Sequence, residues 1–398
     1  MRRILISTIA PVSGGVPMMT RFLAETLRAQ GYVPVLAHYE PYSMSPQMSV
    51  PTFRLLQRRP LGEERRALGD YETHAIGAWV PEFEFTHYFA TSMWKRLMDG
   101  CDAHLTVAGN ALAAMPYYQT GRPFLAWLAA GWQDDRKDRV KFFPQQRRMF
   151  DHALVAPIAA RLEGAILRAG SILSLSQYTR GVLDKIAGTC AVRAVMPMPI
   201  DSNLFSPQPE VRVRGRIGFS GRLDDPRKNL DLLLESLSRM RKSGHGSSAL
   251  LIGGDPGQRL RQKIEQLGLT DAVEFKSYVA QEQLRDLLRT LDVFVVSSHQ
   301  EGLCIAALEA MACGCPLVST RCGGPEEFVI EDETGYLVNF DAVEMAEAIT
   351  RIIGNEVLRH RLAQCARALV VRNYSATKAE GVFWAAFEHQ FAHRMSAA

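Results

Sequence analysis

The sequence lacks long apolar runs. Nowhere in its 398 residues is there a stretch of about 18 consecutive apolar residues, which a membrane-spanning helix needs, so no such helix is predicted. The first residues, MRRILISTIAP, have the basic start of a signal peptide, but their apolar part is short and is interrupted by Ser7 and Thr8. We interpret this segment as the first strand of a cytoplasmic protein. Peripheral attachment at the inner face of a membrane stays open.

Regularly spaced cysteines are also missing. The seven cysteines are odd in number and irregular in spacing, which argues against a disulfide framework and for a reducing compartment. Four of them lie close together in sequence, but without the short paired spacing of structural zinc sites: Cys304, Cys313, Cys315 and Cys322. We expect these side chains to be buried as small apolar groups, and we expect no metal. A net charge of +4 is too small to indicate a nucleic-acid partner.

The length and the pattern of apolar segments indicate two α/β domains. A chain of 398 residues exceeds what one core usually supports. Strand-like and helix-like segments alternate from Arg3, stop at the proline-rich segment 195–201 and begin again at Arg216, which indicates two parallel, doubly wound sheets. Before Val80 we expect a long irregular segment without strands. The predicted boundaries are 1–195, 196–375 and a C-terminal helix over 376–398.

The most informative stretch runs from Ser297 to Gly324. The apolar run VFVV before it indicates a buried parallel strand, and the Leu/Ala/Met-rich segment after Gly302 has helical composition. A helix that begins at the carboxyl end of such a strand directs free N–H groups toward a ligand, which suits phosphate. Glu301 and Glu309 only accept hydrogen bonds when ionised, so their natural partners are hydroxyl groups. The stretch therefore predicts a ligand that contains a ribose, a diphosphate and a sugar.

The same stretch carries a family resemblance. EGLCIAALEAMACGCPLVST, followed by GGPEEFV, resembles the retaining glycosyltransferases of the family 4 type, in which two glutamates are separated by seven residues. The resemblance implies the α/β class and the GT-B fold, with two Rossmann-like doubly wound domains that face each other across a cleft. It also implies that the first domain is on the acceptor side, that the second binds the nucleotide sugar, and that the last helix crosses back to the first domain.

Two cations follow the first strand of the second half. Arg222 and Lys228 stand in the segment GRLDDPRKN. The planar fork of an arginine and the compact charge of a lysine can together neutralise a diphosphate. A surface arginine and a solvated lysine are the alternative interpretation. In the resembled family the matching Arg and Lys hold the donor diphosphate, so the predicted catalytic residues are Arg222, Lys228 and Glu301.

Further donor contacts are implied by the resemblance. The predicted donor-binding residues are Gly302, Leu303, Cys304 and Glu309 around the helix, Tyr278 and Val279 against the base, and Gly14 and Gly15 in the first domain. The helix start would donate N–H groups to phosphate, and Glu309 would accept from the ribose. The turn at Gly14 and Gly15 lacks the GxGxxG fingerprint, so it does not indicate a nicotinamide site. A plain tight turn remains the alternative there.

The sequence departs from the family at one place. Many relatives have a histidine near the 6-position of the donor sugar, after the strand that matches PFLAWLA. This chain has Ala129, Ala130 and Gly131 there, followed by Trp132 and Gln133. The departure leaves open a donor altered at carbon 6, or a replacement contact in the vicinity of Gly131, Trp132 and Gln133 to the donor sugar or the acceptor.

A basic and aromatic segment follows this departure. WQDDRKDRVKFFPQQRRMF mixes arginines and lysines with Phe142 and Phe143. Such a composition suits peripheral contact with an anionic membrane, or a phosphate-bearing lipid acceptor. A solvated helix face is the alternative interpretation.

Taken with the resemblance, these residues predict a retaining glycosyltransferase. It would move a sugar from a UDP-sugar or GDP-sugar, with UDP favoured, to a glycan, a lipid-linked saccharide or a small glycoside in cell-envelope polysaccharide or glycoconjugate biosynthesis. The resemblance implies front-face attack without metal, and no cofactor besides the nucleotide-sugar co-substrate. Two alternatives stay open: a non-catalytic sugar-nucleotide-binding protein, and an epimerase or phosphorylase of the GT-B type.

Overall fold

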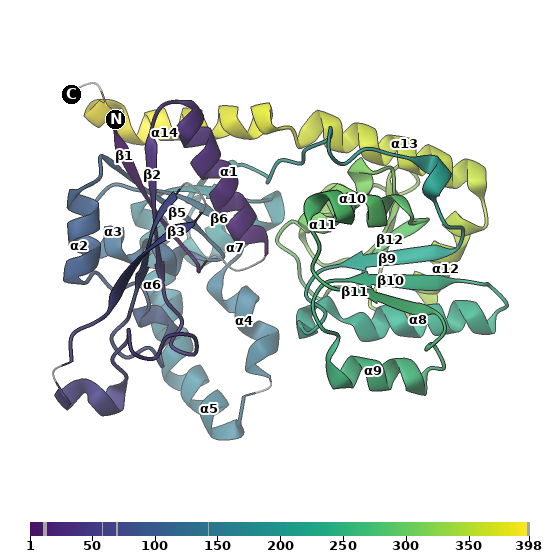
Figure 1. Ribbon diagram of the computed structural model, residues 1–398, viewed down its shortest axis with the longest axis horizontal. Coiled ribbons are helices and arrows are strands. Elements are labelled where there is room, and N and C mark those ends of the chain that lie inside the picture. Colours follow the sequence, from purple (N-terminus) through teal and green to yellow (C-terminus); the bar gives the residue numbers. More distant parts are fainter. Residues whose placement is uncertain (11–13, 58, 69–70, 142, 396–398) are drawn as a thin grey trace. The chain divides into compact units, whose positions relative to one another are not determined.

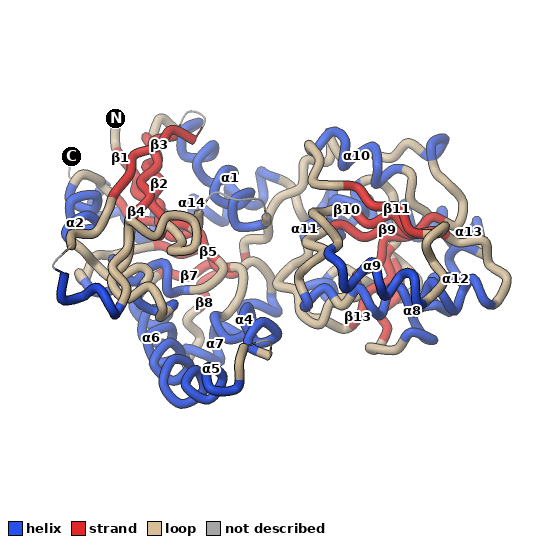
Figure 2. The backbone as a smooth tube through the Cα atoms, turned by 60° about the horizontal axis from the view of Figure 1, so that its bottom comes forward, coloured by secondary structure: helices blue, strands red, loops and turns tan. Residues whose placement is uncertain are grey.

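The computed structural model describes residues 1–10, 14–57, 59–68, 71–141 and 143–395. The chain divides into two compact units. The first comprises Met1–Pro197 and Glu380–Ala398, and the second comprises Met198–Ala379. Each unit contains one twisted sheet with helices on its faces (Figures 1 and 2). The doubly wound pattern expected from the alternating segments is therefore found in both units, whereas their arrangement across a cleft stays a prediction.

The sheet of the first unit has the strand order β3-β4-β2-β1-β5-β6-β7-β8. Its central strands are apolar and buried because a parallel sheet is covered on both faces. The order reverses between β1 and β5, so the loops that follow these two strands meet at one edge of the sheet. The strands are β1 (Arg3–Thr8), β2 (Val33–Tyr39), β3 (Glu63–Leu68), β4 (Tyr71–Ile76), β5 (Ala103–Ala108), β6 (Leu125–Leu128), β7 (Ser171–Ser174) and β8 (Val192–Val195).

Strands β3 and β4 correct the expectation of an irregular segment before Val80. They pair antiparallel, from Glu63 opposite Ile76 to Leu68 opposite Tyr71, and β4 joins β2 in parallel. Their sequences, EERRAL and YETHAI, are charged because β3 lies at the edge of the sheet, where charge protects against association with other strands. A strand of this kind has no apolar run by which a sequence could reveal it.

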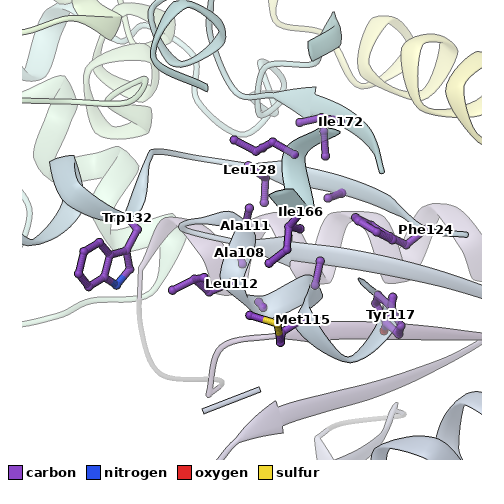
Figure 3. Packing of buried hydrophobic residues seen from close by; sticks show 14 of the residues in the cluster. Ala108, Ala111, Leu112, Met115, Tyr117, Phe124, Leu128, Trp132, Ile166 and Ile172 are labelled. Carbon is purple, nitrogen blue, oxygen red and sulfur yellow. The ribbon is translucent and has the colours of Figure 1, made fainter. Parts of the chain in front are cut away.

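Helices cover the sheet of the first unit and build its core. The buried cluster in Figure 3 includes Phe124 before β6, Ile166 of α6 and Ile172 of β7, together with Leu128 and Tyr117. The helices are α1 (Gly15–Ala29), α2 (Ser92–Asp99), α3 (Met115–Gln119), α4 (Trp132–Val140), α5 (Gln145–Phe150), α6 (Ala156–Ala169) and α7 (Gln177–Ala187), with the short helices η1 (Thr52–Gln57), η2 (Glu84–Thr86), η3 (Ala111–Ala114) and η4 (Asp151–Val155).

The sheet of the second unit is entirely parallel among the described residues. Its strand order is β11-β10-β9-β12-β13-β14, so β9 and β12 are neighbours although two strands separate them in the chain. The carboxyl ends of β9 and β12 therefore form the point at which the strand order reverses, where open α/β sheets bind ligands. The strands are β9 (Arg216–Ser220), β10 (Ser248–Ile252), β11 (Val273–Lys276), β12 (Val293–Val296), β13 (Leu317–Thr320) and β14 (Gly335–Val338).

The helices of the second unit begin with side-chain caps where the sequence supplies them. Asp341 accepts from the free N–H groups at the start of α12, and Asn355 accepts from the start of α13. The helices are α8 (Leu230–Lys242), α9 (Gly257–Gln266), α10 (Gln281–Arg289), α11 (Ile305–Ala312), α12 (Ala342–Ile353) and α13 (Glu356–Asn373), with η5 (Pro209–Val211), η6 (Pro226–Lys228) and η7 (Gly324–Glu327).

The last helix, α14 (Ala376–Met395), begins in the second unit and continues in the first from Glu380. In the first unit Trp384 stacks on Tyr32 with 5.9 Å between the ring centroids, and Phe387 contacts the same ring. These aromatic contacts fix the end of the chain beside the start of β2.

Candidate functional site

The predicted site in the second unit is built on the ends of β9 and β12. Lys228, in η6 after β9, places its Nζ atom 2.7 Å from the Glu301 carboxylate, which follows β12. The hydroxyl of Ser298 donates to the same carboxylate oxygen over 2.5 Å, and the hydroxyl of Ser297 donates to the Lys228 carbonyl over 2.8 Å. Two of the three predicted catalytic residues are therefore in direct contact at the reversal of strand order.

The Lys228 side chain is a charged group in a largely buried position. Burial lowers its pKa, but the neighbouring Glu301 carboxylate outweighs burial, and the pKa of Lys228 is raised overall. The ammonium is therefore charged throughout the physiological range. A phosphate that replaced or joined the Glu301 contact would meet a cation that is poorly hydrated, which strengthens the attraction.

Arg222, the third predicted catalytic residue, lies on the same loop after β9. Its half-exposed guanidinium donates to Asp225 over 2.6 Å, and Arg227 donates to the same carboxylate over 2.9 Å. Burial raises the pKa of Asp225, but the hydrogen bonds and charges of Arg227 and Arg222 lower it to about 2. Asp225 also caps η6 by accepting from the Arg227 N–H group. Asp225 and Arg227 could not be singled out from the sequence, because only the folded loop brings Arg222 and Arg227 onto the same carboxylate.

Helix α11 begins at Ile305, two residues after the start of the segment whose composition predicted it. Gly302, Leu303 and Cys304 form a turn, and Cys304 has φ 68° in the left-handed region, which is unusual for a residue other than glycine. The side chain of Leu303 is buried. Gly324 packs against this turn, and a Cβ atom there would lie 2.5 Å from the Gly302 carbonyl oxygen. The turn is thus fixed in the conformation that precedes the free N–H groups of α11.

Glu309 lies inside α11 and is only 5% exposed. Burial raises the pKa of its carboxyl from the usual 4.5 to about 8, and no other group contributes. Within the described parts of the chain, no donor forms a hydrogen bond with this carboxyl group. A buried carboxyl without a donor is costly to ionise, so its position suits a ligand that brings hydroxyl groups.

Close backbone packing connects the ends of β9, β10 and β11. Gly253, with φ 141°, approaches Gly221 so closely that a Cβ atom would lie 1.8 Å from the Gly221 carbonyl oxygen. Tyr278, after β11, is exposed, and its ring lies 3.3 Å from the position of a Cβ atom on Gly254. Val279 beside it is half-buried. The two residues predicted to contact the base therefore lie at the carboxyl edge that also carries Arg222.

In the first unit, the predicted residues Gly14 and Gly15 lie at the start of α1. Both are exposed, and Gly14 has φ 135°, which favours glycine. The preceding loop residues 11–13 lie outside the described residues. Thr8 at the end of β1 shares a 2.7 Å hydrogen bond with Thr20 of α1, which joins the strand to the helix on both sides of this turn.

The segment after β6, where many relatives have a histidine, contains no exposed aromatic group. Trp132 is buried, and its indole N–H donates to Glu84 over 3.0 Å. A Cβ atom at Gly131 would lie 2.7 Å from the terminal Cδ1 atom of Ile186, so a larger residue here would displace that side chain. Gln133 is exposed at the start of α4. The indole N–H of Trp132 already has a protein partner. Of the predicted residues Gly131, Trp132 and Gln133, Gln133 is therefore the one with an exposed polar side chain.

Glu163 is a buried residue of this region that the sequence analysis missed. From α6 its carboxylate accepts the backbone N–H groups of Trp132 over 3.0 Å and of Ala111 over 3.4 Å. It therefore holds the starts of α4 and η3, which follow β6 and β5. Burial raises the pKa of Glu163 to about 7, although the two N–H donors lower it. The only signal in the sequence is one carboxylate in an otherwise apolar stretch of helix.

Comparison with known proteins identifies the second unit. Residues 207–369 match the model of the family "Glycosyl transferases group 1", a range that contains η6, β12 and α11. These residues form a group 1 glycosyltransferase domain. The expected resemblance to the family 4 type is thereby confirmed.

Relatives of this glycosyltransferase domain cover part of the chain, and solved structures cover all of it. A GDP-mannose-dependent α-(1-6)-phosphatidylinositol monomannoside mannosyltransferase of Mycolicibacterium smegmatis is 30% identical over 206 residues, which are 47% of this chain and 53% of that protein. The chain thus spans about half the length of the curated relatives it matches.

Two solved structures are similar in fold to this chain over nearly its whole length. Sucrose-phosphate synthase from Thermosynechococcus elongatus has a TM-score of 0.77 at 20% identity, covering 99% of this chain and 100% of that one. Anabaena HepE in complex with UDP-glucose has a TM-score of 0.70 at 18% identity, covering 100% of both chains. The expected GT-B fold class is confirmed.

Proposed function

We propose that this chain is a retaining glycosyltransferase that moves a sugar from a nucleotide-diphosphate sugar to a hydroxyl group of a saccharide or lipid-linked acceptor. Cell-envelope polysaccharide or glycoconjugate biosynthesis is the setting that we propose for it. The observation that carries the proposal is the contact of Lys228 with Glu301 at the reversal of strand order, beside the start of α11. This contact places a cation for phosphate next to a carboxylate for sugar hydroxyls.

In the proposed reaction, the bond between the anomeric carbon and a phosphate oxygen breaks. Negative charge develops on the departing diphosphate, and Arg222, Lys228 and the N–H groups that precede α11 would stabilise it. A fixed donor aimed at such a charge contributes about 3 kcal/mol to lowering the barrier. Asp225 accepts a hydrogen bond from Arg222, so the guanidinium would exchange a carboxylate partner for a phosphate one on donor binding.

The two glutamates would hold the carbohydrate parts of the donor. Glu301 would accept from hydroxyls of the transferred sugar, and Glu309 would accept from the ribose. The acceptor oxygen would bond to the anomeric carbon from the face that the diphosphate leaves, and its proton would pass to the leaving phosphate oxygen. Configuration is then retained, and the step needs neither a metal ion nor a protein base.

The base of the donor would stack near Tyr278, and we propose UDP before GDP. Both nucleotides have support among similar proteins, since the mycobacterial relative is GDP-mannose-dependent and the Anabaena structure holds UDP-glucose. The buried Trp132 and the absence of a histidine at Ala130 favour a donor sugar whose carbon 6 differs from that of an ordinary hexose. Gln133 is then the exposed polar residue nearest to this departure.

Calorimetry followed by a transfer assay tests the proposed function. UDP and GDP are titrated into the protein and into the Glu309→Ala variant, and UDP should bind more tightly to the unmodified protein. Product from a panel of sugar nucleotides is then examined by NMR for the anomeric configuration, which should match that of the donor. Binding without transfer or donor hydrolysis across the panel would instead support a non-catalytic sugar-nucleotide-binding protein. Absence of binding by either nucleotide would contradict both.

Among the described residues, none of the helices combines the length and the apolar composition needed to cross a bilayer. A lipid-linked acceptor would therefore have to be met by a surface of the protein.

A further inference from the structure

One end of the first unit exposes large apolar side chains. In η1, Leu56 is 98% exposed and Phe53 is 70% exposed, and in α5 Met149 is 66% exposed. Such groups are usually covered in a monomeric protein, and a concentration of them marks an interaction site. We call these residues, with the further exposed apolar residues Leu55, Trp79, Phe150 and Leu154, the η1–α5 surface.

Contacts within the unit connect the segments of the η1–α5 surface. The N–H group of Thr52, at the start of η1, donates to the Glu82 carboxylate over 2.9 Å. The next residue, Phe83, packs against Phe150 of α5 with ring centroids 5.9 Å apart. Segment 79–85 thus links η1 to α5, and in Figure 1 both helices lie at the lower side of the first unit, with η1 as the short indigo helix.

Cations surround these apolar groups. Arg54 lies over the ring of Phe53, with its guanidinium carbon 5.3 Å from the centroid, and Arg147 lies over Phe143 at 4.3 Å. Arg148, which follows Arg147 in α5, is exposed, and so is Lys141 shortly before α5. Of the nearby acids, Glu84 and Asp151 are paired with Arg136, and the exposed Glu82 accepts the N–H group of Thr52, so the exposed cations outnumber the unpaired acids here.

The exposed apolar residues of this surface differ from those that the sequence suggested for a membrane contact. Phe142 lies outside the described residues, and Phe143 is half-buried beneath Arg147. The side chains that reach solvent are instead Met149 and Phe150, six and seven residues after Phe143, and those of η1.

We propose that the η1–α5 surface binds an anionic lipid bilayer peripherally. Apolar tips on separate short helices, with arginines and lysines between them, fit the boundary between headgroups and acyl chains, where both kinds of group are satisfied together. Each cation near an anionic leaflet adds attraction that weakens with salt. The η1–α5 surface belongs to the first unit alone, and its binding to a bilayer does not require the proposed glycosyl transfer, although a lipid-linked acceptor would be reached through such a contact.

Co-sedimentation of the full chain with vesicles tests this proposal. One preparation contains phosphatidylcholine alone, and the other contains equal parts of phosphatidylcholine and phosphatidylglycerol. The protein should sediment with the anionic vesicles at low salt and much less with the neutral ones. Combining Phe53→Ser, Leu56→Ser and Met149→Ser should weaken binding about tenfold or more, as should Arg147→Gln with Arg148→Gln.

Matched controls come from the second unit. Val357 is 82% exposed in α13, and Arg372 is exposed in the same helix, so Val357→Ser and Arg372→Gln remove comparable groups from another surface. These controls should bind vesicles as the unmodified protein does, and all variants should keep its circular dichroism spectrum.

Two results would overturn the proposal. The first is a protein that stays in the supernatant with anionic vesicles at low salt. The second is self-association in sedimentation velocity that Leu56→Ser abolishes while vesicle binding is unchanged, because the surface would then be covered by a second copy of the chain.

Discussion

The ammonium of Lys228 lies 2.7 Å from the Glu301 carboxylate and joins two residues that are 73 positions apart in the sequence. The contact exists because β9 and β12 are neighbours in the sheet. It also means that each group already has an oppositely charged partner within the protein. A ligand that binds there must therefore satisfy both groups at once, as a phosphate next to a sugar hydroxyl would.

Replacing Lys228 tests its proposed contact with the donor diphosphate. We expect Lys228→Ala to lower turnover by about 10²–10³-fold and to weaken nucleotide-diphosphate binding, because a donor aimed at the leaving group is lost. Transfer assays and calorimetry measure the two effects. Lys263→Ala is the matched control, since Lys263 forms a comparable 2.6 Å ion pair with Glu235 on the helices α9 and α8. Equal activity of the two variants would remove Lys228 from the mechanism.

Ionisation of the buried Glu309 carboxyl should lower the stability of the fold at alkaline pH. Its pKa is about 8 in the folded protein and 4.5 when unperturbed, so the folded chain binds the proton more tightly. The stability linked to that proton is fully present below about pH 4.5 and is lost as the pH rises through about 8. Glu309→Gln removes this dependence.

We therefore expect Glu309→Gln to have a higher melting temperature than the unmodified protein at pH 8 to 9. The increase should be roughly a few degrees for each 1–2 kcal/mol gained in the free energy of unfolding. Glycosyl transfer by the same variant should fall. Melting curves between pH 5 and 9 measure the effect, with the exposed Glu265→Gln as the control. A difference in melting temperature that does not change with pH would contradict the buried, unpaired state of Glu309.

Asp225 should show the opposite dependence. Its pKa is lowered from 3.8 to about 2 by Arg227 and Arg222 against the effect of burial, so it stabilises the fold above about pH 3.8, and this contribution is lost as the pH falls toward 2. Asp225→Asn should lower the free energy of unfolding at pH 7 by about 1–2 kcal/mol, allowing for solvent screening. Urea unfolding at pH 7 and below pH 4 measures this. Asp255→Asn, which removes an exposed ion pair with Arg261, should change little.

Gly253 tests the close packing at the carboxyl edge. Gly253→Ala would place a Cβ atom 1.8 Å from the Gly221 carbonyl oxygen at a φ of 141°, so the loop that carries Arg222 has to move. We expect a loss of about 2 kcal/mol or more in stability, together with weaker nucleotide binding. Gly246→Ala is the control, because no atom lies within 4 Å of its Cβ position. Similar unfolding curves for both variants would refute the tight approach.

The sequence predicted the second unit better than the first for physical reasons. Strand β12 is an unbroken apolar run that is buried on both faces, so its composition alone reveals it. Strand β3 is charged because it lies at an edge, and the same reasoning could not find it. The start of α11 was misplaced because Cys304 adopts a left-handed conformation, which composition does not indicate.

The residues of the candidate site likewise include some that the sequence could predict and some that it could not. Lys228 and Glu301 could be named because each follows a recognisable strand within a family motif. Asp225, Ser298 and Glu163 could not, because their roles depend on contacts that only folding creates. Carboxylates and hydroxyls of this kind are common on any surface, and nothing in their spacing distinguishes the ones that become partners of a functional group.

The solitary carboxyl of Glu309 has a consequence for how a ligand is recognised. Burial raises the pKa of this group to about 8, so near neutral pH it keeps a proton. If ribose hydroxyls donate to it, the ionised form is favoured and the proton leaves for the solvent as the nucleotide enters. The heat of binding would then vary with the ionisation enthalpy of the buffer, and affinity would increase with alkalinity until the group is already deprotonated.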